Sequence, residues 1–337
     1  MTLYFRPIPM TDAARPSNAQ AIAGGWCWFD RVEKITRGGR RKQIPIEEVP
    51  ANVLARITAP RADIAGLTFE TPRLMGILNV TPDSFSDGGD FNAPDVALKH
   101  AHDMVEEGAD ILDIGGESTR PGADVVPIKL EITRTAPVIA AIRAVMQTPI
   151  SIDTRNGAVA EAAIAAGADL INDVSALTHD AKMINVAVDT TAPVCLMHAQ
   201  GVPKTMQDAP RYDDILLDVY DYLEERISVA EAAGIPRSKI MIDPGIGFGK
   251  TTEHCLELLR DISLFHSLGC VILLGASRKT FIGDITGAAS AKDRTFGSVA
   301  VAHMAAMQGV QVLRVHDIMA TKYAISMQLA IATKKRD

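Results

Sequence analysis

The sequence contains few cysteines, and their spacing excludes several classes of protein. Its 337 residues include only four, Cys27, Cys195, Cys255 and Cys270, and no two of them form a CxxC metal or redox motif. They stand mostly in apolar surroundings, where a thiol behaves as a small buried side chain. We therefore expect reduced, buried cysteines and a cytoplasmic protein instead of a disulfide-rich secreted one.

The sequence also lacks an excess of basic residues and long apolar runs. The formal net charge is −7, whereas a general nucleic-acid binder needs a basic surface to meet phosphates. No apolar run reaches the ~18 residues that a membrane helix needs. The start, MTLYFRPIPMTDAARPS, has no apolar stretch typical of a secretory signal. These absences argue against nucleic-acid and membrane partners and favour a small-molecule ligand.

Aromatic residues make up only 5% of a chain that is 47% hydrophobic, so its core must be mainly aliphatic. From Leu74 onward the chain repeats a short apolar strand, a polar loop rich in glycine and a longer amphipathic segment. Eight such units in about 250 residues predict an α/β fold, a TIM (β/α)8 barrel. The strands are expected at residues 74–80, 110–117, 149–154, 169–175, 192–198, 240–245, 271–277 and 310–317. Before three of them, in EEGADILDI, AAGADLIND and MQGVQVLRV, a glycine ends the preceding helix.

The first part of the chain does not share this repeat. WCWFDRVEKI and QIPIEEV flank TRGGRRK, a pattern that predicts a hairpin with a Gly-Gly turn. We predict a small N-terminal β-rich extension of unknown role over 1–68, a barrel over 69–332 and a basic C-terminal tail over 333–337. A solvated turn and strand face is preferred to a nucleic-acid patch for the basic cluster of Arg31, Lys34, Arg37, Arg40, Arg41 and Lys42.

Polar residues gather at the C-terminal ends of the predicted strands. One polar residue there is ordinary, because strand ends meet solvent. Eight strands in succession indicate an active site, because barrel enzymes carry their chemistry at this end. The polar residues at the strand ends are Asn79, Glu117, Asp153, Asn172, Asp173, His198, Asp243, Ser277, Arg314, His316 and Asp317.

Three of these residues suit a flat heterocycle. Asp153, Asn172 and Asp243 follow the third, fourth and sixth strands, so a barrel would point them into one mouth. Carboxylates accept hydrogen bonds and amides both accept and donate, which matches N–H donors beside a carbonyl. A guanine-like or pterin edge is such a ligand. Two alternatives remain open: Asp243 could cap the helix after DPGIGFGK, and Asn172 could be a satisfied strand-end side chain.

Three further residues suit an anion and a metal ion. Arg314 and His316 lie two residues apart, on one face of the eighth strand, and a guanidinium beside an imidazole forms an anion clamp. Phosphate sites near the seventh and eighth strands recur in barrels. Asn79 could ligate Mg²⁺ through its side-chain oxygen, since hard cations prefer oxygen ligands.

The loops after the first two strands are longer than barrel connections usually are. NVTPDSFSDGG and ESTRPGADVVP are expected to close as lids that exclude water. Their candidate lid residues are Asp83, Ser84, Phe85 and Ser118. Arg120 in the second loop is a candidate cation for an anionic leaving group, although an exposed loop arginine without a partner is the alternative.

The segments MGILNVTPDSFSDGG, DIGGESTRPGA, SIDT, INDVSAL, IDPGIGFGK, LLGASRK and LRVHD resemble dihydropteroate synthase, over about residues 69–332. The resemblance implies a transferase of folate biosynthesis, a homodimer that uses Mg²⁺ and is a target of sulfonamides. It would join 6-hydroxymethyl-7,8-dihydropterin diphosphate to p-aminobenzoate, forming 7,8-dihydropteroate and diphosphate.

The resemblance also implies roles for individual residues. Asp153, Lys279, Arg120, Arg314 and His316 would be catalytic. Asp153, Asn172, Asp243, Phe248, Gly275 and Lys279 would bind the pterin. The diphosphate would bind to Asn79, Thr119, Arg120, Arg314 and His316. Asn79 would also hold Mg²⁺. Thr119, Pro121, Phe248, Ser277 and Thr280 would bind p-aminobenzoate.

Two positions depart from the family pattern: Thr280 stands where many members have Ser, and Ala199 where many have Met. Two other functions stay open. A methyltetrahydrofolate-dependent methyltransferase also uses a pterin-binding barrel, but it would have no use for STRPGA and LRVHD. A non-catalytic pterin-binding protein would lose the anion clamp or the lids, and both are present here. The sequence leaves sulfonamide sensitivity open.

Overall fold

The computed structural model describes residues 2–80, 93–117, 126–201 and 206–333. Its strands are β1 (Leu3–Pro7), β2 (Gln20–Ala21), β3 (Trp28–Phe29), β4 (Arg31–Thr36), β5 (Arg40–Pro45), β6 (Arg73–Asn79), β7 (Ile111–Gly115), β8 (Ile150–Asp153), β9 (Leu170–Asp173), β10 (Val194–Met197), β11 (Ile240–Asp243), β12 (Val271–Leu274) and β13 (Val312–Val315).

The α-helices are α1 (Ala51–Thr58), α2 (Ala93–Glu107), α3 (Ile128–Val145), α4 (Gly157–Ala165), α5 (Lys182–Thr190), α6 (Ile215–Ala232), α7 (Thr252–Arg260), α8 (Thr280–Thr286), α9 (Thr295–Ala306) and α10 (Ile318–Thr333). Short 3-10 helices are η1 (Ile46–Glu48), η3 (Arg237–Lys239), η4 (Ile262–Leu268) and η5 (Ala291–Arg294).

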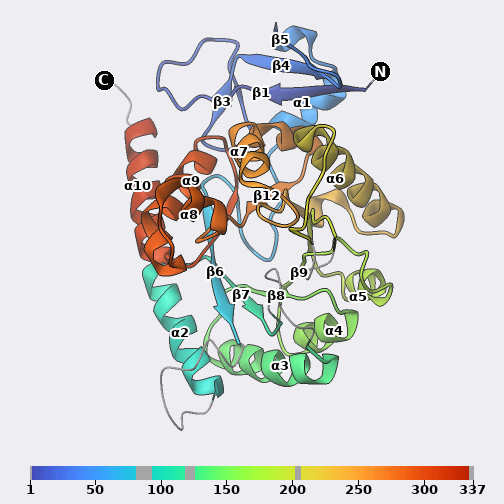
Figure 1. Ribbon diagram of the computed structural model, residues 1–337, viewed down its shortest axis with the longest axis vertical. Helices are drawn as coiled ribbons and strands as arrows, with labels where there is room; N and C mark the ends of the chain where they lie inside the picture. The colour runs from blue at the N-terminus through green and yellow to red at the C-terminus, as the bar shows by residue number, and fades with distance from the viewer. Residues whose placement is uncertain (1, 81–92, 118–125, 202–205, 334–337) are drawn as a thin grey trace.

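The eight strands from β6 to β13 form a closed parallel barrel, in which β13 pairs with β6. Helices alternate with these strands and surround them (Figure 1). The predicted barrel is therefore confirmed, and each predicted strand is present. The first, β6, starts and ends one residue earlier than predicted, and the other seven are shorter than predicted. The glycines before β7, β9 and β13 adopt positive φ, as expected for residues that end a helix: Gly108 (106°), Gly167 (111°) and Gly309 (80°).

Side chains alternate between the two faces of the barrel wall, because successive residues of a strand point to opposite sides. Leu78, Ile114 and Ile152 belong to the large apolar cluster that includes buried residues of the outer helices. A separate cluster groups residues near the strand starts, which we call the apolar floor: Met75, Ile111, Leu170, Cys195, Met241, Val271, Leu273 and Val312. Ile64, Leu67 and Phe69 join the floor from the N-terminal segment, so they close that end of the barrel.

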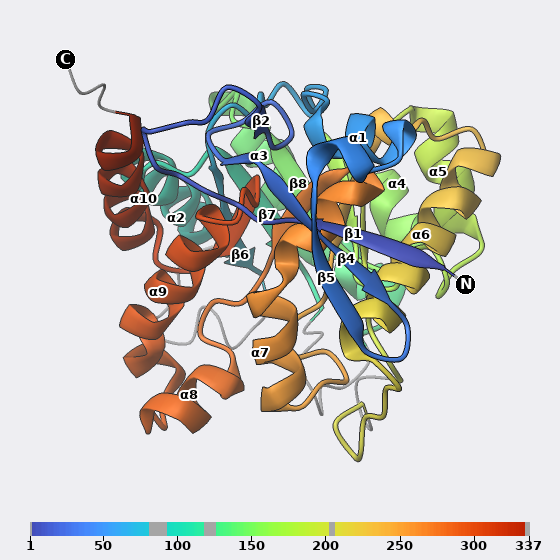
Figure 2. The same ribbon diagram turned by 90° about the horizontal axis from the view of Figure 1, so that it is seen from above.

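The N-terminal residues build a small sheet with the order β1-β4-β5, all antiparallel. β4 and β5 form the predicted hairpin, with Gly38 and Gly39 at its turn. Phe5, Phe29 and Val32 lie in its own buried cluster with residues of α1. Figures 1 and 2 show this sheet beside α6 and α7, and β6 and β7 point away from it in Figure 1.

The basic cluster of this hairpin is mostly solvated, as predicted, because four of its six residues are exposed, and Lys34 and Arg37 are partly buried. Two of its arginines also form ion pairs with the barrel. The Arg37 guanidinium pairs with Asp218, at 2.5 Å, and with Asp221, at 2.7 Å, both on α6. Arg41 pairs with Asp261 at 2.6 Å. These ion pairs form because the hairpin packs against an acidic part of the barrel that is distant in sequence.

All four cysteines are buried and unpaired, as predicted. Within the described residues, none of the helices combines the length and the apolar character that crossing a lipid bilayer requires.

Candidate active site

Four adjacent strands, β6 to β9, align one row of residues at their C-terminal ends, and three of these residues have polar side chains. Pairing sets Asn79 opposite Gly115, Gly115 opposite Asp153, and Asp153 opposite Asn172. A Cβ atom added to Gly115 would lie 3.6 Å from both Asn79 Oδ1 and Asp153 Cβ. Glycine at this position therefore leaves space over which the Asn79 and Asp153 side chains meet.

Arg314 lies on β13, the strand that pairs with β6 to close the barrel, and its side chain reaches this row. Its Nε donates to Asp113 at 2.6 Å and its Nη2 donates to Asp153 at 2.8 Å. Asn172 Nδ2 also donates to Asp113, at 3.3 Å. Asp113 is fully buried and was missed by the sequence analysis. Its position could have indicated it, since Asp113 stands two residues before Gly115 and residues two apart on a strand share a face.

Asp153 retains an unused acceptor. Its Oδ1 is buried and has no hydrogen-bond partner among the described residues, whereas Oδ2 accepts from Arg314. Burial raises the pKa of Asp153, and the nearby Asp113 carboxylate raises it further, while the Arg314 guanidinium opposes both effects. A buried acceptor without a partner is rare in a folded protein and marks a place where a ligand donor can bind.

Asp243 lies at the same end of the barrel. A Cβ atom added to Gly275 would lie 3.6 Å from Asp243 Oδ2 and 3.7 Å from Arg314 Cδ. Asp243 Oδ1 accepts from the Gly245 amide at 2.7 Å, and burial raises the pKa of its carboxyl. The helix-cap alternative for Asp243 is wrong, because Thr251 caps α7. We call Asp113, Asp153, Asn172, Asp243 and Arg314 the polar cluster.

Lys279 and Phe248 border Asp243. The Lys279 ammonium lies 4.4 Å from the centre of the Phe248 ring, within cation–π range, and donates to the Ile246 carbonyl. Burial lowers the pKa of Lys279 to about 8, and the Asp243 carboxylate opposes that shift. The structure therefore joins Asp243, Phe248 and Lys279 in one local group.

The turn after β12 lies next to β13. Ser277 Oγ contacts His316 Nδ1 at 3.0 Å and accepts from the His316 amide at 3.2 Å. Thr280 is the first residue of α8 and is exposed. Arg314 and His316 thus have different partners: the guanidinium contacts carboxylates and the imidazole contacts Ser277.

Other polar residues at strand ends are used locally. Glu117 accepts two hydrogen bonds from Arg155, both 3.1 Å. Asp173 accepts from backbone amides of the following turn, and Asp317 pairs with Arg278. His198 contacts Lys250, a buried lysine that the sequence analysis did not single out. Asp83, Ser84, Phe85, Ser118, Thr119, Arg120 and Pro121 lie outside the described residues.

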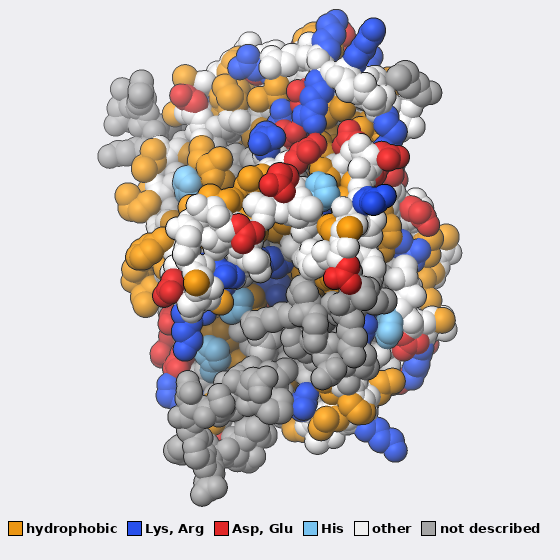
Figure 3. All heavy atoms as spheres, in the orientation of Figure 1, with side chains coloured by type: hydrophobic (Ala, Val, Ile, Leu, Met, Phe, Trp, Pro, Cys, Tyr) orange, Lys and Arg blue, Asp and Glu red, His pale blue; other side chains and the backbone are white. Residues whose placement is uncertain are grey.

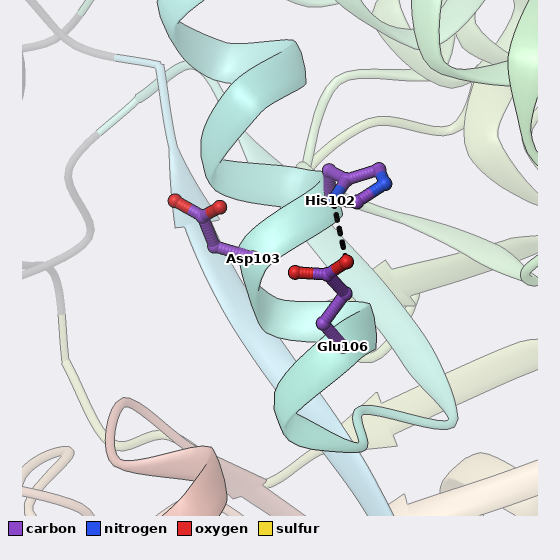
Figure 4. Close-up of side chains that lie close together, drawn as sticks. All are labelled: His102, Asp103 and Glu106. Carbon is purple, nitrogen blue, oxygen red and sulfur yellow. Dashed lines mark ion pairs between the residues drawn. The ribbon is translucent and has the colours of Figure 1, made fainter.

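Another group of potential metal ligands lies on the outer helix α2. Figure 4 shows His102 paired with Glu106, at 3.6 Å, and Asp103 pointing to another side of the helix. Asp103 accepts from Lys99 at 2.6 Å instead. His102 and Glu106 are exposed and Asp103 is partly exposed, so these contacts are ordinary surface ion pairs.

Known proteins resemble this chain over the barrel. A family model described as "Pterin binding enzyme" matches residues 75–316. The dihydropteroate synthase of Escherichia coli K12 is 44% identical over 271 residues, which are 80% of this chain and 95% of that protein.

Two solved structures extend the similarity to the fold. Dihydropteroate synthase of Xanthomonas albilineans with 4-aminobenzoic acid has a TM-score of 0.77 and 46% identity, over 82% of this chain and 99% of the other. The same enzyme in complex with 7,8-dihydropteroate has a TM-score of 0.75 and 43% identity, over 82% of this chain and 100% of the other. Sequence and barrel thus agree, and the chain belongs to the dihydropteroate synthases of the pterin binding enzyme family.

Proposed function

We propose that this chain is a transferase that joins 6-hydroxymethyl-7,8-dihydropterin diphosphate to p-aminobenzoate, yielding 7,8-dihydropteroate and diphosphate. One observation supports this most strongly: side chains from five strands converge as the polar cluster at the C-terminal end of the barrel. The bound molecules of the two Xanthomonas albilineans structures are a substrate and the product of that reaction.

The pterin ring is proposed to bind the polar cluster. The Asp153 Oδ1 atom, which is buried and finds no partner within the part of the chain that the structure describes, can accept from a ring N–H. Asn172 and Asp243 offer an amide and a carboxylate beside it, and Gly275 leaves room between Asp243 and Arg314. Phe248 and Lys279 would contact the ring from its side.

The diphosphate is proposed to bind at Asn79, Arg314 and His316, with Thr119 and Arg120 from the second lid loop. The donor set near Asn79 fits Mg²⁺, because the Asn79 and Asp153 side chains, which meet over Gly115, carry the oxygen ligands that this ion prefers. Asn79 would hold the ion, which when bound supplies positive charge against the departing diphosphate.

The reaction breaks the bond between the pterin methylene and a diphosphate oxygen, and the bonding electrons leave with that oxygen. The p-aminobenzoate nitrogen forms the new bond to the methylene and then releases a proton. Arg314, Arg120 and His316 would stabilise the leaving anion, and Asp153 the positive charge that develops on the pterin. Arg314 has a second task, since its bond to Asp153 fixes that carboxylate. The lid loops would exclude water from the positively charged pterin, through Asp83, Ser84, Phe85 and Ser118.

p-Aminobenzoate is proposed to bind beside the turn that follows β12. Ser277 and Thr280 offer hydroxyl groups there, and Phe248 offers an aromatic face. Thr119 and Pro121 would complete this site.

A coupled assay tests the proposed function. The protein is incubated with the pterin diphosphate, p-aminobenzoate and Mg²⁺, and both diphosphate and dihydropteroate are measured. Equal amounts of the two products support the proposal. Release of diphosphate without dihydropteroate, or no turnover, contradicts it.

We further propose a homodimer formed through α8–α10. Figure 3 shows apolar side chains gathered over these helices on the left side of the view, and large exposed apolar patches usually mark interfaces. A dimer by light scattering, converted to a monomer by Tyr323→Glu, is expected; a monomeric wild-type protein contradicts this. Exposed apolar residues on α9 and α10 include Phe296 (88%), Tyr323 (65%), Met327 (62%) and Ile331 (74%).

Residues 1–68 are proposed to stabilise the barrel as a separate extension, with the barrel over 69–332. The Trp26 indole donates to the Ala306 carbonyl at 2.7 Å, and the Arg61 guanidinium donates to the carbonyls of His266 and Cys270. A cytoplasmic location also remains a proposal, which the unpaired cysteines support.

A further inference from the structure

The loop between β11 and α7 has an unusual set of hydrogen bonds. Each of its five successive carbonyl oxygens, from Gly245 to Gly249, accepts from a side chain. Lys250 Nζ donates to the carbonyls of Gly245, at 2.8 Å, and Phe248, at 3.1 Å. The Gly249 carbonyl accepts from Tyr212 at 2.7 Å. The two remaining carbonyls lie between Gly245 and Phe248. The Ile246 carbonyl accepts from Lys279, and the Gly247 carbonyl accepts from Gln207.

The glycines of this loop allow it to lie against the segment after β10. Gly245 and Gly249 have φ values of 67° and 63°, in the left-handed region that favours glycine. A Cβ atom would lie 1.8 Å from the His198 carbonyl oxygen at Gly245, and 2.5 Å from that of Gln200 at Gly249. Other residues at these positions would push the loop away from β10.

Lys250 connects the two segments. Its side chain is only 3% exposed, and its Nζ contacts His198 Nδ1 at 2.8 Å and the His198 carbonyl at 3.3 Å, in addition to the two loop carbonyls. None of these four partners is a carboxylate. Burying an amine that no carboxylate neutralises is costly, and an apolar side chain would fill the space at lower cost. The arrangement therefore indicates a role beyond packing.

The loop also contacts the residues proposed to bind the pterin. The Gly245 amide donates to Asp243 Oδ1 at 2.7 Å. Lys279 binds the Ile246 carbonyl and lies over the Phe248 ring. A shift of this loop would therefore move three groups of the proposed pterin site together.

We propose that Lys250 is a positioning residue: its amine holds the Gly245–Gly249 loop against the end of β10 and thereby sets the places of Asp243, Phe248 and Lys279. This inference rests on the proposed function. Lys250 itself does not touch the substrate; it acts through the loop.

The protonation of Lys250 should change how firmly it holds the loop. An ammonium has three protons for the four acceptors, whereas a neutral amine has two. Burial lowers the pKa of Lys250 to about 7, so the third proton is lost near neutral pH. Burial also lowers the pKa of His198, so its ring stays neutral and Nδ1 can accept. The other titratable groups around Lys250 are Cys255, Lys279 and Asp243, and those around the His198 ring are Tyr212 and Tyr222.

The test compares Lys250→Met with Lys239→Met. Lys239 is a matched control, because it also donates to a carbonyl, that of Thr191, but in an exposed hydrogen bond. It precedes β11, whereas the loop follows that strand. Binding of the pterin diphosphate is measured by calorimetry between pH 6 and pH 9. Lys250→Met should weaken binding about tenfold or more, since buried acceptors lose their donors, and Lys239→Met should leave it unchanged.

The pH profile separates positioning from a merely structural role. Wild-type affinity should fall as pH rises through about 7, where Lys250 loses its proton. This step should disappear in Lys250→Met, while the change near pH 8, where Lys279 loses its proton, should remain. If Lys250→Met binds the pterin diphosphate as tightly as the wild-type protein does, and with the same pH dependence, the inference is overturned. If Lys250→Met does not fold, Lys250→Gln, which keeps two donor protons, undergoes the same comparison.

A crystal structure of the folded variant keeps this inference distinct from the proposed function. Displacement of Phe248 from Lys279 supports the inference even if the wild-type protein shows no turnover. An unmoved loop overturns it even if the wild-type protein is fully active.

Discussion

The two ends of the barrel interior are built from the same strands but differ in chemistry. At the strand starts, the apolar floor is buried and is closed by residues of the N-terminal segment. Two residues further along, Ile111 gives way to Asp113, Leu170 to Asn172, Met241 to Asp243 and Val312 to Arg314. The carboxylates of the polar end are also buried and Arg314 is partly buried, so these groups are present despite the cost of desolvation. The floor stabilises the fold, and the polar end is the proposed binding site.

Removing the cation of the polar end should have the largest effect. Arg314→Ala leaves Asp113 and Asp153 buried without their shared partner. We expect kcat/KM to fall about a hundredfold or more, which corresponds to about 2.7 kcal/mol of transition-state stabilisation. Stopped assays with both substrates measure it.

Arg143→Ala is the control at the opposite end. Arg143 pairs with Asp169, just before β9. This variant should lose stability and retain kcat/KM near the wild-type value. A comparable loss of activity in both variants would contradict the functional difference between the two ends.

Shortening a side chain of the floor should reverse this pattern. Leu273 is fully buried in the apolar floor, so Leu273→Ala should cost about 2–5 kcal/mol of unfolding free energy. Urea unfolding measures that loss. Activity per folded molecule should remain close to wild type, and a loss as large as that of Arg314→Ala would show that the floor also shapes the site.

The polar end should also make stability depend on pH. Burial raises the pKa of Asp153, so the folded state binds its proton more tightly than the unfolded state. The resulting stabilisation is complete below the ordinary aspartate pKa, about 3.9, and is lost as pH rises through the raised folded value. Asp153→Asn should make the fall in stability over that range shallower, as measured by urea unfolding at several pH values.

Asp180→Asn provides a control of opposite sign. Backbone amides of Lys182 and Gly157 hold the pKa of Asp180 below its usual value, so its stabilisation is present above the ordinary pKa and lost as pH falls. Removing this carboxylate should reduce the loss of stability at low pH. The same change of slope in both variants would contradict the assignment for Asp153.

The smallest effect is expected where the extension meets solvent. The Arg37 pairs with Asp218 and Asp221 are 28% to 46% exposed, so solvent screens them. Arg37→Gln should cost no more than about 1 kcal/mol and leave activity unchanged. Thermal unfolding measures it, and a loss comparable to that of Leu273→Ala would show that ion pairs hold the extension in place.

The barrel could be predicted because its signals are local. Eight apolar strands, the glycines before three of them and the polar residues after them can each be read within a short window. The polar cluster was predicted in part for the same reason: Asp153, Asn172, Asp243 and Arg314 stand at or next to strand ends. Asp113 was missed because it lies in the middle of its strand, β7, and not at the C-terminal end.

Contacts between distant segments could not be predicted. Lys250 and His198 are 52 positions apart, and Arg37 and Asp218 are 181 apart. Such pairs depend on how whole elements pack, which neither strand periodicity nor motif spacing specifies. The same limit applies to Arg314 on β13. Its partners Asp113 and Asp153 lie on β7 and β8, which are separated from β13 by β6 in the barrel.

The most direct test of a single pterin site at the polar end is a crystal structure with the dihydropterin diphosphate bound. The ring is expected within hydrogen-bond distance of Asp153, Asn172 and Asp243, with its diphosphate toward Arg314. A ring bound elsewhere on the molecule, with the polar cluster empty, would contradict it.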